Sequence, residues 1–204
     1  MGEPTSEPGQ RLLSAALGLF AELGYDQTTS QLIADVAGLP VVTIRTEFGG
    51  KRELYLAVIK HVHEEEQALL DRMTETYTHD AAGIHRLLDQ YLDHFVDHPR
   101  EAALWMQRRM YDASDLRDIE RLYSFPQIHA VSELTAELVR PDVDMELVIW
   151  GIVWSVQTFV YGGIPDAQGG RSSAVDRRAV ARFRRHLHSS IDPLLRRDPD
   201  EAAS

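Results

Sequence analysis

One stretch constrains the fold more than any other, because it predicts two short helices joined by a tight turn. It spans residues 28–51 and reads TTSQLIADVAGLPVVTIRTEFGGK. Thr28 or Thr29 can cap the first helix with its hydroxyl. Gly38 supplies the left-handed backbone that ends a helix, and Pro40 suits the first turn of the next one because its missing N–H would be unpaired there. The predicted unit is helix, turn, helix.

The second helix of this pair has one apolar face and one outward face. Ile44 and Phe48 lie four residues apart and can pack on the first helix. The positions that then point outward are Val41, Val42, Arg45 and Thr46. Such a pair forms a helix-turn-helix, whose second helix can lie in the major groove of B-DNA. The same pattern also occurs in helical proteins that do not bind DNA, so the flanking sequence has to decide.

The flanks resemble those of a known family. Upstream, LLSAALGLFAELGY carries an apolar stripe that ends at Gly24 and Tyr25, and downstream GGKRELYLAVI opens a long helix at Lys51. Over residues 10–60 the chain resembles the TetR family of bacterial transcriptional regulators, and beyond residue 60 the resemblance is confined to the number and placement of helices. The matching positions are Ala15, Phe20, Gly24, Tyr25, Thr28, Ile33, Ala34, Ala37, Gly38, Thr43, Phe48, Lys51 and Leu54.

The resemblance implies an all-α fold. An N-terminal three-helix DNA-binding domain with the helix-turn-helix would be followed by a C-terminal helical domain for ligand binding and dimerisation. On this basis we expect a disordered tail at 1–9, the DNA-binding domain at 10–55, the helical domain at 56–197 and a second disordered tail at 198–204. In the family, the helix that begins at Lys51 transmits ligand-induced movement, and the last two helices of each subunit form a four-helix dimer bundle.

The resemblance also implies a set of DNA contacts, which fall on Thr29, Gln31, Val41, Thr43, Arg45, Thr46 and Lys51. This chain departs from the family pattern in having Val41-Val42 where Lys-Gly is common, and Arg45 and Glu47 where Tyr and a following His are usual. Arg45 can still reach phosphate or guanine. Val41 is limited to apolar contacts such as a thymine methyl, and Glu47 would repel phosphate. The departures bear on operator sequence and affinity more than on the fold.

Composition limits the function classes. A net charge of −11 argues against non-specific coating of nucleic acid, which is driven by cations that release counterions from phosphate. The absence of cysteine excludes disulfides and thiolate sites and is compatible with a cytoplasmic location. The first ten residues lack the basic start and apolar core of a signal peptide. The sequence contains neither a Gly-rich phosphate loop nor a GxSxG elbow, so we expect no enzyme, no catalytic residues and no cofactor.

The apolar run MELVIWGIVWSVQTFVYGGI at 145–164 has two interpretations. A membrane span is the first, but the run contains Ser155, Gln157 and Thr158, and carboxylates rather than basic anchors precede it. The favoured alternative is a helix that packs within its own domain on one side and against a second subunit on the other. We therefore expect a homodimer and no membrane partner.

Two clusters of possible metal ligands are not expected to hold a metal ion. His94 and His98 lie four residues apart, a spacing that can chelate zinc, but the sequence nominates no third ligand. Consecutive residues on a helix point in different directions, so the run Glu64-Glu65-Glu66 predicts a solvated face. No metal site is expected from the sequence.

Aromatic and Met side chains concentrate on the middle and penultimate helices. Stripes of this kind are ordinary core more often than pocket, yet a mostly apolar cavity with a few polar anchors is typical of small-molecule sites. The candidate ligand-binding residues are Tyr91, Phe95, Trp105, Met106, Arg109, Met110, Tyr123, Trp150, Trp154 and Gln157. The sequence thus favours a repressor that binds a palindromic operator and is released by a bulky, largely apolar small molecule. The alternative is a dimeric helical module that binds a small molecule or a protein and has little DNA affinity.

Overall fold

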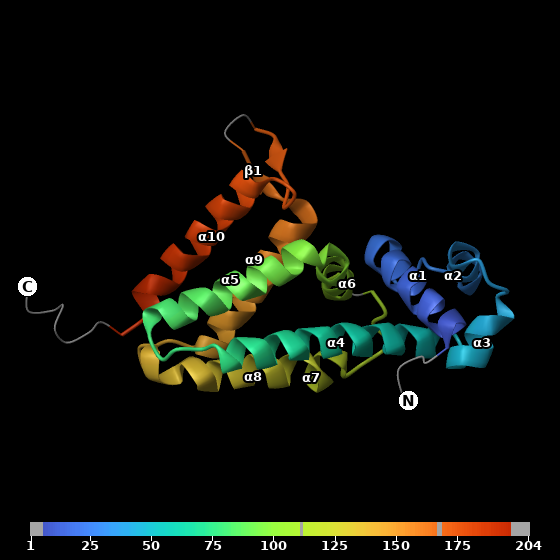
Figure 1. The fold of residues 1–204 in the computed structure, drawn as a ribbon, viewed down its shortest axis with the longest axis horizontal. Helices are drawn as coiled ribbons and strands as arrows, with labels where there is room; N and C mark the ends of the chain where they lie inside the picture. Colours follow the sequence, from blue (N-terminus) through green and yellow to red (C-terminus); the bar gives the residue numbers. More distant parts are fainter. Residues whose placement is uncertain (1–5, 111, 167–168, 197–204) are drawn as a thin grey trace, which may run out of the picture. The chain divides into compact units, whose positions relative to one another are not determined.

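The computed structural model describes residues 6–110, 112–166 and 169–196. In that part of the chain it has ten α-helices, two short 3-10 helices and one hairpin of two-residue strands (Figure 1). The all-α fold class expected from the sequence is confirmed. The chain divides into two compact units, Met1–Ala68 with His98–Asp118, and Leu69–Asp97 with Ile119–Ser204.

The first unit contains the predicted three-helix domain and one helix from later in the chain. Its helices are α1 (Glu7–Leu23), α2 (Ser30–Ala37), α3 (Val42–Phe48), the first part of α4 (Lys51–Glu75) and α6 (Pro99–Arg109). Helix α6 packs along α1, which is why residues 98–118 join this unit. The observed units therefore differ from the predicted division near residue 55.

Helix α1 begins earlier than predicted. The Ser6 hydroxyl accepts a hydrogen bond from the Gly9 N–H at 3.0 Å, and Pro8 fits the first turn, so the helix starts at Glu7. Residues 7–9, predicted as part of a disordered tail, are thus helical. The rest of that tail at 1–5, and the predicted tail at 198–204, lie outside the described residues.

The core of the first unit is built around Phe20. This side chain is fully buried on α1, and its ring meets the buried Tyr55 ring of α4 edge to face at 5.0 Å between centroids. The Tyr25 ring completes the group, 4.8 Å from the Tyr55 ring. Helix α1 also contacts α2 and α3, and the same four helices bury aliphatic side chains: Leu12, Ala16, Ile33, Ile44, Leu54 and Val58. Helix α1 thus joins α2, α3 and α4 through apolar residues.

The second unit is built from the end of α4 and from the remaining helices. They are α5 (Ala81–Asp97), α7 (Ile119–Leu122), α8 (Ser124–Thr135), α9 (Met145–Gly162) and α10 (Arg177–Ile191), with the 3-10 helices η1 (Ala136–Leu138) and η2 (Asp192–Leu194). The Phe159 and Phe183 rings stack at 4.3 Å and join α9 to α10. A second apolar cluster forms around Leu69, Met73 and Leu87.

One segment of the second unit differs from the sequence-based expectation. The sequence indicates no regular element between α9 and α10, but β1 (Ile164–Pro165) and β2 (Arg171–Ser172) pair antiparallel there. Ile164 pairs with Ser172 in this register. Strands of two residues carry too little periodicity to be predicted from sequence alone.

Replacing Phe20 with Ala should lower the free energy of unfolding by about 3–5 kcal/mol, because it opens a cavity beside the Tyr25 and Tyr55 rings. Leu23→Ala is the matched control, since Leu23 is an exposed apolar residue of the same helix, and it should change stability by less than about 0.5 kcal/mol. Urea denaturation followed by circular dichroism measures both. Equal losses for the two variants would contradict the assignment of Phe20 to the core.

Candidate DNA-binding and effector sites

Helix α2 begins and ends where the sequence predicts. The Thr29 hydroxyl accepts a hydrogen bond from the Leu32 N–H at 3.1 Å, and Gly38 ends the helix in the left-handed region with φ of 64°. The Arg11 guanidinium donates to the Ala37 carbonyl at 2.5 Å and so caps the end of α2 from α1. Arg11 therefore serves the fold of the helix-turn-helix.

Helix α3 places its residues as predicted. Ile44 and Phe48 are buried against the other helices of the first unit. Its outward residues are Val41 at 42% exposure and Val42 at 63%, together with the exposed Arg45 and Thr46, while Thr43 is half-buried. The exposed face thus carries two valine side chains, one guanidinium and one hydroxyl, a mixture suited to apolar and hydrogen-bonding contacts with base edges.

Two predicted DNA-contact residues lie close to α3 in the chain and already make internal hydrogen bonds. The Lys51 ammonium donates to the Tyr25 and Thr28 carbonyls, each at 2.8 Å, and lies 4.1 Å from the centre of the Tyr25 ring. An ammonium has three N–H donors, so these two bonds leave one for another acceptor. On α2, the Gln31 amide donates to the Asp35 carboxylate at 2.7 Å.

The acidic residue of α3 has a partner within the protein. The Glu47 carboxylate accepts a hydrogen bond from the Ser6 hydroxyl at 2.5 Å, just before α1 begins. Arg45 and Arg52 are the exposed arginines of α3 and the start of α4, and the Arg52 guanidinium lies 3.6 Å from the Glu53 carboxylate. Positive charge beside the outward face of α3 therefore comes mainly from Arg45.

The loop between α1 and α2 is hydrogen-bonded to Asp112, in the segment that follows α6. The Asp112 carboxylate accepts hydrogen bonds from the Tyr25 N–H at 2.6 Å and from the Asp26 N–H at 2.9 Å. A side chain at Gly24, whose φ is 80°, would come within 2.9 Å of this carboxylate. Sequence reasoning missed Asp112, because a single acid 86 residues from its partner leaves no local pattern.

The predicted ligand-binding residues are divided between the two units. Trp105, Met106, Arg109 and Met110 belong to the first unit, and Tyr91, Phe95, Tyr123, Trp150, Trp154 and Gln157 belong to the second. In the second unit, Tyr91 and Phe95 form an edge-to-face pair at 4.9 Å. Trp150 lies 5.5 Å from Phe125 of α8 and 5.8 Å from Trp154. Among the described residues of this unit, these two aromatic contacts are additional to the Phe159–Phe183 stack between α9 and α10.

Within the predicted set, burial differs greatly. Phe95 is fully buried, Gln157 is a buried polar residue on α9, and Tyr91, Tyr123 and Trp150 are half-buried. In the first unit, Met110 is exposed, and Trp105 is buried with its indole N–H donating to the Glu66 carboxylate at 2.7 Å. The half-buried and buried polar members are the better candidates for ligand contact, because a ligand needs accessible surface and polar anchors.

Trp154 instead belongs to an exposed stripe along α9. Leu147, Trp154 and Tyr161 recur every seven residues and are 60%, 43% and 50% exposed. Gly151 lies on the same stripe, and a Cβ added there would meet nothing within 4 Å. Helix α9 is long and apolar enough to cross a membrane by length and composition, but its other face packs against α5 and α8.

The acidic run on α4 is not uniformly solvated, contrary to the prediction. Glu65 is exposed and Glu64 pairs with Lys60 one turn earlier, as a solvated face requires. Glu66 as a residue is half-buried, and its carboxyl is covered beside Trp105. The pKa of this carboxyl is raised from 4.5 to about 8, mainly by burial; the Trp105 hydrogen bond opposes the shift, and the Glu101 carboxylate makes a smaller contribution that raises it. The interpretation of Glu66 as a solvated residue was wrong.

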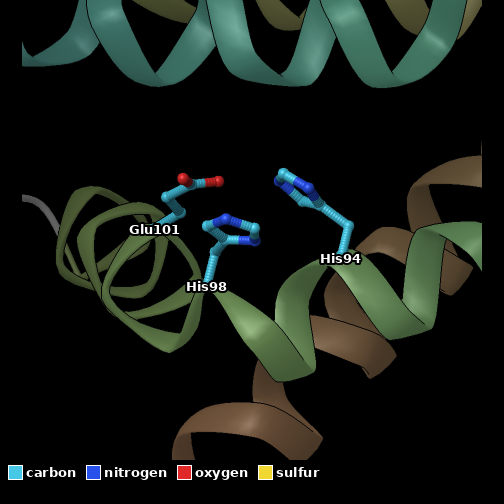
Figure 2. Close-up of side chains that lie close together, drawn as sticks. All are labelled: His94, His98 and Glu101. Atoms are coloured by element: carbon cyan, nitrogen blue, oxygen red, sulfur yellow. The ribbon is translucent and has the colours of Figure 1, made fainter. Parts of the chain in front are cut away.

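His94, His98 and Glu101 converge at the end of α5 and the start of α6 (Figure 2). Each offers one ligand atom, and these atoms all lie within 4.8 Å of one another. Glu101 is the third ligand that the sequence did not nominate. The sequence did hold a signal for this third residue, because Glu101 follows His98 by three residues. Pro99 between them starts α6, so Glu101 lies in the first turn of that helix.

The family model for "Bacterial regulatory proteins, tetR family" matches residues 12–58, which run from α1 into α4. The HTH-type transcriptional regulator RutR of Escherichia coli (strain K12) is 29% identical over 107 residues, covering 52% of this chain and 50% of RutR. RutR of Shigella flexneri matches equally well. The chain spans about half the length of the curated relatives it matches.

Solved structures of regulators share the fold over nearly the whole chain. The ketosteroid transcriptional regulator KstR2 of Mycobacterium tuberculosis has a TM-score of 0.65 and 19% identity, covering 95% of this chain and 97% of KstR2. The fatty acid degradation regulator FadR from Bacillus halodurans has a TM-score of 0.67 and 17% identity, with 92% and 98% covered. Residues 12–58 thus match the N-terminal domain of the TetR family of transcriptional regulators, and the chain as a whole shares the fold of these solved regulators.

Proposed function

We propose that this protein regulates transcription in the bacterial cytoplasm by binding a palindromic operator as a homodimer, and that a bulky, largely apolar small molecule releases it. The observation that carries the proposal is the exposed face of α3 on a helix-turn-helix within the segment that matches the family. The family consists of transcriptional regulators and not of enzymes, in agreement with the expectation from sequence. Repression is the sign of control that the family resemblance favours.

In the proposed DNA complex, α3 lies in the major groove. Arg45 donates to guanine or phosphate, and Val41 contacts a thymine methyl group. Thr29 and Gln31 at the start of α2, and the remaining Lys51 donor, lie near phosphates, while Thr43 and Thr46 complete the contacts of α3. The hydrogen bond from Ser6 to Glu47 supports the proposal, because it gives this carboxylate a partner other than DNA phosphate.

The exposed stripe of α9 supports dimerisation through the last two helices. Leu147, Trp154 and Tyr161 place three large apolar side chains on a helix face that is open in the monomer. Gly151 between them allows a second helix to approach closely, because nothing lies within 4 Å of the position of an added Cβ. A two-fold axis across this face would present two copies of α3 to two half-sites of the operator.

Effector release is proposed to act through α6. This helix carries three of the candidate ligand residues and Met110 caps its end, and the chain that follows it binds the α1–α2 loop through Asp112. In the second unit, Trp150 and the buried Gln157 are candidate contacts for an apolar ligand with one polar group. A ligand shifts operator binding only to the extent that it prefers one arrangement of α6 over another.

The direct test is binding of the purified protein to DNA fragments from around its own gene, at about 50 and 200 mM salt and against scrambled competitor. We expect tight binding at one palindromic site that weakens steeply with salt, since phosphate contacts release counterions. Absence of sequence-specific binding near the gene would favour the rival proposal, a helical binding module with little DNA affinity. The observations that support this rival are the weak positive charge of the helix-turn-helix region and the acidic Glu47 on α3.

Arg45→Ala should weaken operator binding by about 1–3 kcal/mol, or roughly five- to 150-fold in Kd, and should relax the preference for one base pair. Fluorescence anisotropy with operator variants measures both effects. Arg178→Ala is the control, because Arg178 is an exposed arginine at the start of α10, outside the helix-turn-helix. Unchanged affinity of the Arg45 variant would remove this residue from the DNA site.

Lys51→Met should affect both stability and DNA binding. Loss of the two carbonyl hydrogen bonds should lower the free energy of unfolding by about 1–3 kcal/mol, and loss of a phosphate contact should lower the salt slope by about one. Lys60→Met is the control, because Lys60 forms a surface ion pair with Glu64 on the same helix. A stability loss with an unchanged salt slope would assign Lys51 to the fold alone.

Trp154→Asp should convert the dimer to a monomer, because it buries an unpaired charge in the proposed interface. Val175→Asp is the control at an exposed apolar position that lies between the hairpin and α10, off the α9 stripe. Sedimentation velocity at micromolar protein measures the mass, and circular dichroism checks that both variants keep their helices. A dimeric Trp154 variant would contradict the proposed interface.

A further inference from the structure

The turn from α5 into α6 brings nitrogen and oxygen donors together within eight residues. His94 lies in the last turn of α5, His98 directly precedes α6, and Glu101 lies in the first turn of α6. Pro99 starts the new helix immediately, and the Glu101 N–H donates to the His98 carbonyl at 3.1 Å. The short turn therefore holds the three side chains in one place (Figure 2).

The geometry of these donors is close to that of a metal site. Their ligand atoms lie within 4.8 Å of one another, whereas ligands about 2.0–2.1 Å from a tetrahedral zinc ion are roughly 3.4 Å apart. A small adjustment of side-chain rotamers would close this difference. His94 and Glu101 are only 7% and 5% exposed, and the exposed His98 leaves one side open to an arriving ion.

Glu66 adds a second carboxyl group next to Glu101. The Trp105 indole N–H fixes one of its oxygens at 2.7 Å, and Trp105 lies one helical turn after Glu101 on α6. A carboxylate held beside metal ligands commonly tunes metal affinity.

We propose that His94, His98 and Glu101 bind one divalent transition-metal ion of the zinc class, with Glu66 as the neighbouring carboxylate that balances its charge. Imidazole and carboxylate together suit Zn²⁺ and its neighbours in the first transition row, and they disfavour Mg²⁺ and Ca²⁺, which take oxygen ligands. A water molecule can supply the fourth ligand of a tetrahedral site. The proposal is independent of the proposed DNA-binding function.

A second histidine pair supplies an internal comparison. His85 and His188 stack at 4.2 Å between ring centroids, but each imidazole bonds its own carboxylate, Asp192 and Asp89 respectively, at 2.7 Å. The stacked rings face each other, whereas a shared ion needs the ring nitrogens to converge in the ring planes. This pair should therefore bind zinc weakly.

The test is zinc binding by the full chain after treatment with chelator and dialysis. Competition with a chromophoric zinc indicator should reveal one site per chain with Kd below about 1 μM, and zinc should raise the melting temperature by mass action. Cobalt(II) in place of zinc should give the intense visible absorption of a four-coordinate ion. No saturable site tighter than about 100 μM would overturn the proposal and leave a hydrogen-bonded cluster only.

Variants locate the site. His94→Ala and Glu101→Gln should each weaken zinc binding by more than about 100-fold, and Glu66→Gln by about 10–100-fold. His188→Ala is the matched control and should bind as the wild type does. Melting of the metal-free proteins checks folding, and the cobalt spectrum gives an independent readout in the unaltered chain. Zinc binding that survives in the His94 and Glu101 variants, or that is lost in the His188 variant, would overturn the assignment.

Discussion

The helix-turn-helix depends on charged side chains that satisfy the backbone of the loop between α1 and α2. Lys51 donates to the Tyr25 and Thr28 carbonyls, and Asp112 accepts from the Tyr25 and Asp26 N–H groups. Hydrogen bonds to charged groups contribute more to stability than neutral ones, and unpaired backbone groups are costly. This loop sets where α2 begins, and α2 with its glycine turn sets the placement of α3.

The same arrangement bears on the proposal that an acidic protein binds DNA through α3. Several charges of the first unit are used internally: Arg11 caps α2, Lys51 holds the loop, and Glu47 accepts from Ser6. Charges with internal partners contribute less to the field at the surface than their number suggests. The outward face of α3 is therefore described better by Arg45 and its apolar neighbours than by the net charge of the chain.

Local signals in the sequence were sufficient to predict the helix-turn-helix. Thr29, Gly38, Ile44 and Phe48 act within a few residues of their own positions, and the structure places each of them as predicted. Contacts between distant residues were not predictable. In the sequence, Asp112 and Glu66 do not differ from ordinary surface acids. The role of Asp112 depends on the packing of α6 against α1, and that of Glu66 depends on the Trp105 side chain, which binds it on α4.

The candidate sites of the helical body were predicted less completely, for a related reason. An aromatic stripe on α9 does not reveal which face is covered, so Trp150 and Trp154 were grouped although Trp154 lies on the exposed stripe. The pair His94 and His98 was visible, but Glu101 joins them only because Pro99 turns the chain there. The periodicity of apolar residues predicts the helices, but the packing between helices determines which of their residues are buried, exposed or brought together.

The bond between Asp112 and the α1–α2 loop also bears on the order of events during synthesis. The loop leaves the ribosome some 86 residues before the carboxylate that accepts its N–H groups. A nascent chain that ends before α6 has every residue of the helix-turn-helix but lacks this acceptor, so the loop stays bonded to water. The bonding of the helix-turn-helix region is therefore completed only after α4, α5 and α6 have all been made.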